Sequence, residues 1–399
     1  ESAAIAFLHS YQNPAHEEQV AELLREKGME YVSVSSNLSS SIKIIPRAET
    51  ALVNAYLEPV IDTYLEGVRA HMSAGRLDVM TSAGGVVHSS QFRPKDSLLS
   101  GPAAGVVGAA AVGRSEGEEK VFSFDMGGTS TDVARYDEEF EYVFEHEVGD
   151  AHLAAPAVSI ETVAAGGGSI CSYDGHSLQV GPESAGAFPG PACYGAGGPL
   201  TVTDVNLLLG RLDPLNFHIP VAREAARERF DEVVAAVQAD SDEEVDEREI
   251  LEGFADIANE RMAKAIRKIS LRKGYDPQEY ALVPYGGAGG QHACAIARRL
   301  GTERILLPID AGVLSAHGLG NASREHFAEQ QVLEPLHAVE EDLAARMGTV
   351  AQEAKDRLRN EGVPPDRVEV RRQLVCMRLE GQETTLEVGY GGNGALRDS

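Results

Sequence analysis

The chain has 399 residues, too many for one compact core, and its 43% hydrophobic and 24% charged residues are typical of a globular protein. A formal charge of −27 opposes binding to nucleic acid or to an anionic membrane, and no apolar run approaches the roughly 20 residues needed to span a bilayer. The four cysteines are far apart and form no Cys-x-x-Cys pair, so the sequence indicates neither a disulfide framework nor a structural zinc site and fits a reducing cytoplasm.

The start of the chain already has the pattern of a buried strand. The first residue is Glu1 rather than Met, and Ser2 to Leu8 is almost wholly apolar. No basic segment of a signal peptide precedes this run. Because a domain rarely opens inside a core strand, we expect further sequence upstream.

The first part of the chain alternates predicted strands and helices, the pattern of an α/β unit. Asn13 is a candidate N-cap, followed by Pro14 at the first helical position. The helix after residue 50 is predicted from apolar residues at helical spacing, namely Leu52, Tyr56, Val60, Tyr64 and Val68. The expected elements are strands at Ser2–Leu8, Tyr31–Ser35 and Leu77–Thr81, and helices at Pro14–Lys27, Thr50–His71 and Gly101–Val112.

A charged break at Gly113–Lys120 precedes a predicted β-hairpin. Its strands are Val121–Phe124 and Asp132–Tyr136, and the short polar turn between them excludes a βαβ unit. A third strand is expected at Glu141–His146.

The stretch 166–198 is dominated by Gly, Pro, Ala and Ser, so we expect a long ordered loop or short irregular strands there. Loops of this length in globular domains are usually functional. Regular elements follow it. They are helices at Ala222–Gln238, Glu247–Lys273 and Gln291–Leu300, strands at Tyr280–Val283 and Ile305–Leu307, and two C-terminal strands within Val368–Val388 broken at Gly381, which indicate a separate β-rich region.

The strongest motif is the predicted hairpin turn. Gly127 and Gly128 allow positive φ and close approach to a ligand, so successive backbone N–H groups can point into one concavity that binds an anion. Hydroxyl donors at Thr129, Ser130 and Thr131 add to this.

Two carboxylates flank this turn. Asp125 and Asp132 would repel phosphate directly, so they make sense as partners of a metal ion that bridges to it. The alternative is a type I′ hairpin turn whose Asp and Thr side chains satisfy the backbone. The combination of glycines, hydroxyls and carboxylates favours the phosphate site.

A second motif joins the strand ending at Tyr285 to a helix. A helix N-terminus offers free N–H groups, and glycines let a flat group such as a purine lie against the backbone. No Gly-Lys-Ser/Thr follows, so this is not a Walker loop. By itself the motif is ambiguous between nucleotide binding and tight strand–helix packing. Its candidate ligand-binding residues are Gly286, Gly287, Ala288 and Gly289.

A third candidate is the glycine run before Ser169. Gly167, Gly168 and Ser169 could approach a ligand through their backbone, or form a crowded turn beneath another loop. Cys193 has no His or Asp fixed near it by sequence, so a small buried hydrophobe is favoured over a nucleophile. His292, at a helix start, could face a ligand or serve as a cap or core residue.

Six motifs in chain order resemble the hydantoinase A / 5-oxoprolinase / acetone carboxylase β-subunit family. The likeness runs from Glu1 to about Leu386. The motifs are SGPAAGVVGAA (100–110), FDMGGTSTDVA (124–134), AAGGGSI (164–170), GPACYGAGGPLTVTDVNLLLGRL (190–212), YGGAGGQHACAIARRLG (285–301) and GVLSAHGL (312–319).

The resemblance implies an α/β fold of actin-like (ribonuclease H-like) ATPase lobes with an incomplete first lobe. Residues 1–115 would be the later part of the first lobe, 116–325 the second lobe, and 326–399 the start of a β-rich C-terminal domain. The turn from Asp125 to Asp132 would be the second-lobe phosphate hairpin, with Asp125 near magnesium and Thr129 and Thr131 contacting phosphate. Gly286–Gly289 would be the adenosine loop.

The implied activity uses ATP and Mg²⁺ to phosphorylate the carbonyl of a cyclic amide or ketone, for hydrolysis or carboxylation. A hydantoinase B-like second subunit or fused domain would complete the reaction, within an oligomer. Two alternatives stay open, a sugar-kinase-like or chaperone-like ATPase of the same fold and a truncated, non-catalytic interaction module. The long 166–198 segment argues against the first.

The family's own N-terminal phosphate hairpin has no counterpart in this sequence. We therefore expect residues 1–399 alone to hydrolyse ATP poorly compared with the complete enzyme, since half of the phosphate clamp would be absent. An ATPase assay of both proteins checks this, and equal rates would contradict it.

Overall fold

The computed structural model describes residues 1–217, 219–382 and 385–391 and shows a mixed α/β fold, as the sequence predicts. Two compact units are present, each built from separate stretches of chain. Unit 1 comprises 1–99, 143–157 and 323–399, and unit 2 comprises 100–142 and 158–322. The three-part division made from sequence stays a prediction. Across the described ranges, no helix has the length and apolar character needed to cross a membrane.

Unit 2 is organised around a five-stranded sheet. Its order is β12-β6-β5-β15, with β7 added beside β6. Strands β5 and β6 form the predicted antiparallel hairpin, and β15 lies parallel to β5. The strands are β5 (Lys120–Met126), β6 (Thr131–Asp137), β7 (Glu139–Phe140), β12 (Ile160–Val163) and β15 (Ala281–Tyr285).

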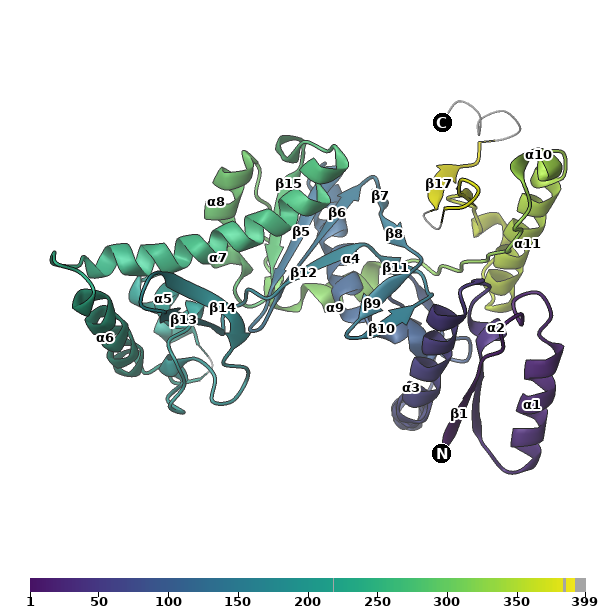
Figure 1. Cartoon of the computed structure of the whole chain (residues 1–399), viewed down its shortest axis with the longest axis horizontal. Helices are drawn as coiled ribbons and strands as arrows, with labels where there is room; N and C mark the ends of the chain where they lie inside the picture. The colour runs from purple at the N-terminus through teal and green to yellow at the C-terminus, as the bar shows by residue number, and fades with distance from the viewer. Residues whose placement is uncertain (218, 383–384, 392–399) are drawn as a thin grey trace. The chain divides into compact units, whose positions relative to one another are not determined.

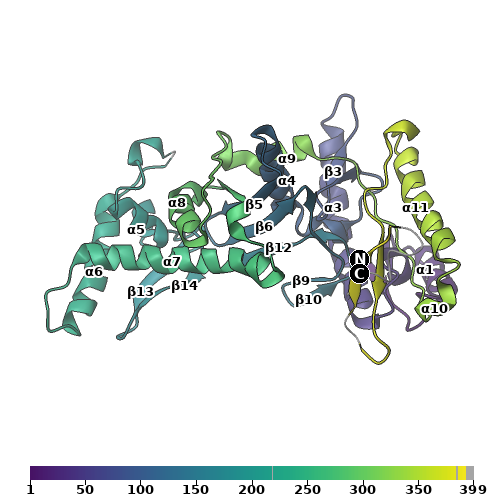
Figure 2. The same cartoon turned by 90° about the horizontal axis from the view of Figure 1, so that it is seen from above.

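Alternation along β5 gives the sheet two buried faces. Phe122, Phe124 and Met126 belong to a core shared with helices α7 and α8, whereas Val121 belongs to a second core shared with α4 and α9. Helix α7 runs along β14, β12 and β6 in both views (Figures 1 and 2). A sheet covered on both faces is a rigid platform, and the hairpin turn lies at its end.

The remaining elements of unit 2 are helices, one further β-hairpin and short turns. They are α4 (Ser100–Ser115), β13 (Ser169–Tyr173), β14 (Leu178–Ser184), α5 (Val202–Leu208), α6 (Arg223–Ala239), α7 (Glu247–Ile269), α8 (Gly289–Leu300), α9 (Leu314–Asn321) and short 3₁₀ turns at Ala192–Tyr194, Pro214–Asn216, Leu271–Lys273, Pro277–Glu279 and Ala311–Val313. Strands β8 (Tyr142–Val143) and β11 (Ala157–Val158) lie where the chain passes between the two units.

Unit 1 is made of small two-stranded sheets and helices. Strands β1 and β2 are parallel, and the other pairs are antiparallel. The elements are β1 (Ser2–Ile5), α1 (Ala15–Glu26), β2 (Tyr31–Val34), α2 (Ser35–Leu38), α3 (Ile44–Ala70), β3 (Asp78–Met80), β4 (Val86–His88), β9 (His146–Val148), β10 (Ala151–Leu153), α10 (Leu336–Val339), α11 (Leu343–Asn360), β16 (Leu374–Met377), β17 (Leu386–Gly389) and 3₁₀ turns at Pro94–Ser97 and Pro365–Arg367.

Some sequence expectations need correction. The expected strand at Glu141–His146 is broken into β8 and the start of β9, and Ile305–Leu307 makes only a single bridge, between Ile305 and Leu282. The 166–198 segment forms the regular β13–β14 hairpin within its loops. The N-cap of α1 is Pro14, one residue later than expected, while Asn13 Oδ1 accepts from the Ala15 N–H at 3.1 Å.

Helix α3 (Ile44–Ala70) includes most of the predicted helix Thr50–His71 and begins earlier, but the apolar stripe that predicted it is not its buried face. Tyr56 is 77% exposed, and Leu52, Val60 and Tyr64 are exposed as well. The buried positions are instead small or polar, such as Ala51, Ala55, Thr50 and Asn54. Periodicity therefore identified the helix, whereas the close approach of α3 to β1, β2 and β10 selects small residues on the packed face.

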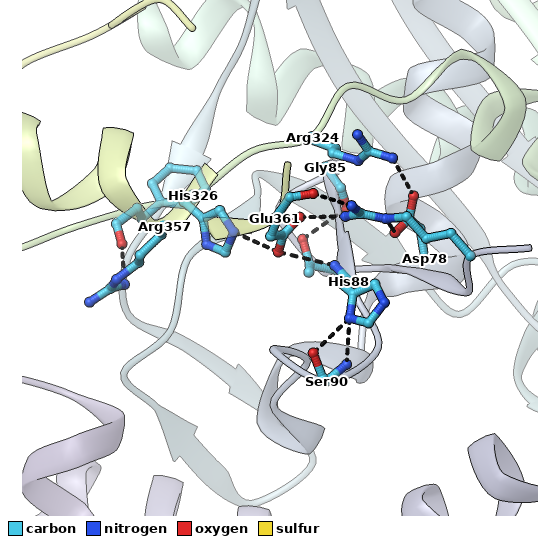
Figure 3. Close-up of polar contacts among 11 residues, drawn as sticks. Asp78, Gly85, His88, Ser90, Arg324, His326, Arg357 and Glu361 are labelled. Carbon is cyan, nitrogen blue, oxygen red and sulfur yellow. Dashed lines mark hydrogen bonds and ion pairs between the residues drawn. The ribbon is translucent and has the colours of Figure 1, made fainter. Parts of the chain in front are cut away.

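A charged cluster in unit 1 fastens the end of α11 to the β3–β4 hairpin (Figure 3). The side chain of Glu361 is 2% exposed and accepts from Arg76, from His326 Nε2 at 2.9 Å and from the His88 N–H at 3.1 Å. Asp78 accepts from Arg76 and from Arg324. Both carboxylates therefore have cationic partners, and we interpret the cluster as one that stabilises the packing of α11 on the β3–β4 hairpin.

We expect Glu361→Ala to destabilise unit 1 by roughly 2–4 kcal/mol, because it removes the acceptor of His326 and of the His88 N–H and leaves Arg76 with Asp78 as its carboxylate partner. The matched control is Glu353→Ala, which removes an exposed ion pair with Arg357 and should cost at most about 1 kcal/mol. Chemical denaturation of both variants measures the difference. Equal midpoints would show that the cluster contributes nothing.

Candidate functional site

The β5–β6 turn presents unpaired backbone donors. The Gly127 N–H donates to Ser130 O at 3.1 Å and closes the turn, while Gly128 and Thr129 are exposed. Within the described part of the chain, the N–H groups of Gly128, Thr129 and Ser130 have no hydrogen-bond acceptor. Three consecutive free N–H groups suit an anion.

The expected positive φ at Gly127 and Gly128 is not found, since neither residue is in that region. What glycine provides here is space. A Cβ added at Gly128 would meet nothing within 4 Å, and one at Gly127 would meet only Ser130 O, at 3.9 Å. The turn is thus open toward a ligand without an unusual backbone conformation.

Asp125 and Asp132 flank the turn on one face of the hairpin. They are direct partners in the antiparallel register, an arrangement that places both side chains on the same side. Burial and the neighbouring Asp132 charge raise the pKa of Asp125 from its usual 3.8 to about 6. Asp132 Oδ1 also accepts from Thr162 Oγ1 at 2.6 Å. Two carboxylates in this position would be stabilised by a cation.

The β15–α8 loop lies directly beside this hairpin. The Ala288 N–H donates to Met126 O at 3.0 Å, and Gly286 has φ +76°. A side chain at Gly286 would overlap the Asp125 carboxylate, and one at Gly289 would come within 3.3 Å of Phe124 O. Gly287, by contrast, is exposed and has nothing within 4 Å of an added Cβ. Gly287 is therefore the open position of this loop.

The glycine run 166–168 supports the hairpin turn through its backbone. The N–H groups of Gly167 and Gly168 donate to the carbonyls of Gly127 and Gly128 at 3.0 and 2.6 Å. A side chain at Gly166 would lie 2.7 Å from the Gly128 backbone. Close packing of two backbones, rather than an open surface, explains glycine at this position.

Two of the predicted site hydroxyls are buried in contacts that hold this loop. Thr131 Oγ1 donates to Ala165 O, and Ser169 Oγ accepts from the Gly166 N–H at 2.9 Å. Both side chains are essentially unexposed. The structure therefore brings Gly127, Gly128, Thr129 and Gly287 to the open side of the site, with Thr131 and Ser169 beneath it.

Sequence reasoning missed the residues that anchor the glycine run. The N–H and Oγ1 of Thr203 both donate to Gly167 O at 2.8 Å. Asp204, fully buried, accepts from the N–H groups of Ala192 and Cys193 and from the Thr201 N–H and hydroxyl. The signal was present, because Thr201-Val202-Thr203-Asp204 has the spacing of a capping box at the start of α5.

Cys193 and His292 do not face the open side of the site. Cys193 is 1% exposed, packs with Leu207 and Ala226, and burial raises the pKa of its thiol, which confirms the expected small buried hydrophobe. His292 is fully buried in α8.

No cluster of three or more His, Cys, Asp or Glu side chains that could hold a metal occurs among the described residues. Mg²⁺ is commonly held by one or two carboxylates together with phosphate oxygens and water. The Asp125–Asp132 pair beside free N–H groups fits that donor set.

Comparisons with known proteins identify the family of this chain. Residues 47–327 match the hydantoinase/oxoprolinase family. Among curated proteins, the 5-oxoprolinase PfmaA of Pestalotiopsis fici is 43% identical over 84% of this chain, and the caprolactamase subunit alpha of Pseudomonas jessenii is 33% identical over 80%. The crystal structure of the ATP-dependent caprolactamase from Pseudomonas jessenii superposes with a TM-score of 0.78 at 28% identity, over 98% of this chain.

The chain spans only part of each of these proteins. It covers 27% of PfmaA, 47% of the caprolactamase subunit and 58% of the caprolactamase crystal chain. The match to the family nevertheless extends over most of this chain and includes the hairpin, the glycine run and the β15–α8 loop. The chain belongs to the hydantoinase/oxoprolinase family.

Proposed function

We propose that this chain is the nucleotide-binding part of an ATP-dependent enzyme that opens a cyclic amide. The observation that carries the proposal is the convergence of an open, N–H-rich turn, two flanking carboxylates and the open Gly287 of the β15–α8 loop. Such a combination suits a phosphate chain, its metal and a nucleoside.

The proposed roles follow from this geometry. Gly127, Gly128, Thr129 and Ser130 hold phosphate oxygens, and Asp125 holds Mg²⁺ with support from Asp132. Gly286–Gly289 receive the adenosine, with Gly287 in closest approach. Thr131, Gly167, Gly168 and Ser169 contribute by keeping the turn in place.

Bound ATP supplies the phosphoryl group that converts the amide oxygen into a leaving group. The N–H groups of the turn are already oriented before the ligand arrives, so they stabilise negative charge on phosphate without rearranging. Asp125 must be ionised to hold a cation, and because its pKa is raised to about 6, only about half of the carboxyl groups are ionised at pH 6 and nearly all are ionised only above about pH 7.

The substrate class and the partner are proposed from the relatives. Similarity to 5-oxoprolinase PfmaA and to a caprolactamase subunit favours a lactam, 5-oxoproline or a hydantoin. Since one relative is named as a subunit alpha, a hydantoinase B-like second subunit or fused domain is proposed to complete hydrolysis. We place the enzyme in the cytoplasm, in keeping with four cysteines that are all free.

The test is an assay of ADP release and ring opening by the whole enzyme with 5-oxoproline, hydantoin and caprolactam. The proposal expects one of them to stimulate ADP release, with ring opening dependent on ATP. Ring opening without ATP would contradict it. Transfer of phosphate to a sugar hydroxyl would instead identify the sugar-kinase-like alternative.

A further inference from the structure

His292 is a buried polar residue that the proposed mechanism does not use. It lies one turn into α8 within an otherwise apolar core, and both of its ring nitrogens are occupied. Nδ1 lies 2.7 Å from Asn259 Oδ1 of α7, and Nε2 lies 3.0 Å from Asn206 Nδ2 of α5. Asn206 and Asn259 are each 1% exposed. The three side chains therefore join three helices.

Arg211 fixes the direction of every bond in this network. Its NH1 donates to Asn206 Oδ1 at 3.2 Å, and a guanidinium can only donate. The Asn206 amide must then turn its NH₂ toward His292, so Nε2 accepts and Nδ1–H donates to Asn259. His292 is thus a neutral imidazole, and burial together with the Arg211 charge lowers its pKa to about 4.

The network links the two segments that support the site. Asn206 is one turn beyond Thr203, which holds Gly167, which in turn donates to the hairpin carbonyl of Gly127. On the other side, His292 is one turn beyond Gly289 and the loop whose Ala288 N–H donates to Met126 O. Both glycine loops are therefore tied to α5 and α8, the helices that His292 joins.

We propose that His292 is a positioning residue that sets the spacing between the hairpin turn and the β15–α8 loop. Apolar packing alone is non-directional and would let α5 and α8 slide, whereas two buried hydrogen bonds, which are directional, specify one arrangement. This inference rests on the proposed nucleotide site, because the spacing matters only if one ligand touches both loops.

Two substitutions distinguish a role of the His292 hydrogen bonds in positioning the loops from a role of its side-chain volume in packing. His292→Gln keeps one donor and one acceptor, whereas His292→Leu keeps the bulk and removes both. The dissociation constant for Mg·ADP is measured by calorimetry with the whole enzyme, well below each variant's melting temperature. We expect it to rise about tenfold or more for His292→Leu and less than threefold for His292→Gln. Unchanged affinity in a folded His292→Leu variant would overturn the proposal.

Amide hydrogen exchange provides a readout that needs no ligand. In His292→Leu the amides of Gly167, Gly168 and Ala288 should exchange faster, while the Leu306 amide, which donates to Leu282 O elsewhere in the unit, should not change. Uniform acceleration at all four amides would mean a purely structural role and would overturn the inference. If His292→Leu does not fold, Asn206→Ala removes the bond between α5 and α8 together with the Arg211 contact and leaves the His292–Asn259 bond in place, and the same pattern is expected.

Mg·ADP binding by the wild type tests the proposed nucleotide site, whereas amide exchange tests the role of His292. If wild-type protein binds no Mg·ADP, the proposed function of this site fails. The exchange pattern still decides whether His292 sets the loop spacing.

Discussion

Asp125→Asn is expected to lower ATP turnover of the whole enzyme by roughly 10²–10³-fold, the range seen when one preorganised electrostatic group is removed from an active site. Asparagine keeps the size of the side chain and removes its charge. Without that charge, the metal proposed to bridge to phosphate loses its nearest protein ligand, and Asp132 alone must hold it. Steady-state ADP release at saturating ATP measures the loss.

The same variant should be more stable than wild type at neutral pH. The pKa of Asp125 is raised from 3.8 to about 6 in the folded chain, so its ionisation opposes folding as pH rises between these values. Because the side chain is partly exposed, we expect a gain of only about 1–2 kcal/mol at pH 7–8 and none below pH 4. Denaturation of the metal-free chain at pH 4 and pH 7.5 tests the sign.

Asp137→Asn is the matched control on the same hairpin. Asp137 lies at the far end of β6 and accepts from Tyr280 Oη at 2.7 Å and from Arg135 at 3.0 Å. Its substitution should lower stability and leave turnover unchanged, the reverse of Asp125→Asn. If both variants lose activity in proportion to stability, Asp125 has no special role in the reaction.

The sequence predicts most elements of unit 2, because local signals and packing agree there. Strands β5 and β6 alternate correctly, the turn between them is short and polar, and Asp125 and Asp132 follow as register partners. Failures occur where packing overrides local pattern. Tyr56 and its apolar neighbours on α3 are exposed, since the buried face is chosen by close helix approach rather than by hydrophobicity.

In the C-terminal region the sequence predicts the strands but not the long helix before them. The break at Gly381 correctly separates two strands, β16 and β17, although residues 383–384 lie outside the described part. Helix α11 was not assigned from sequence. Its C-terminal end, at Glu361, is held by contacts with residues distant in sequence, Arg76 and the His88 N–H.

Within the candidate site, the sequence identifies the loops but cannot assign their glycines. Gly128, Gly166, Gly286 and Gly287 look alike in a motif, yet only Gly128 and Gly287 have empty space beside them. Gly166 and Gly286 are glycine because another backbone or carboxylate occupies that space. The distinction depends on which loops meet, and no short-range pattern encodes that meeting.

Because Gly287 has empty space beside it, we expect Gly287→Val to weaken nucleotide binding strongly without destabilising the fold. The variant should bind Mg·ADP at least about tenfold more weakly, equivalent to ~1.4 kcal/mol or more, and should melt at the wild-type temperature. A Cβ at this position would meet no protein atom within 4 Å, and φ at Gly287 is not positive, so we expect the chain to accept the side chain. A nucleoside that rests on the loop would collide with this side chain. Calorimetry and a melting curve on the whole enzyme give the two quantities.

Gly286→Val, one residue earlier, is the control that should show the opposite behaviour. Its side chain would collide with Asp125 and would need φ +76°, which a β-branched residue rarely adopts. Its melting temperature should therefore fall by several degrees. If Gly287→Val instead melts lower with unchanged affinity, the β15–α8 loop is a packing element. In that case the nucleoside must lie elsewhere, and only the hairpin turn would remain as the phosphate site.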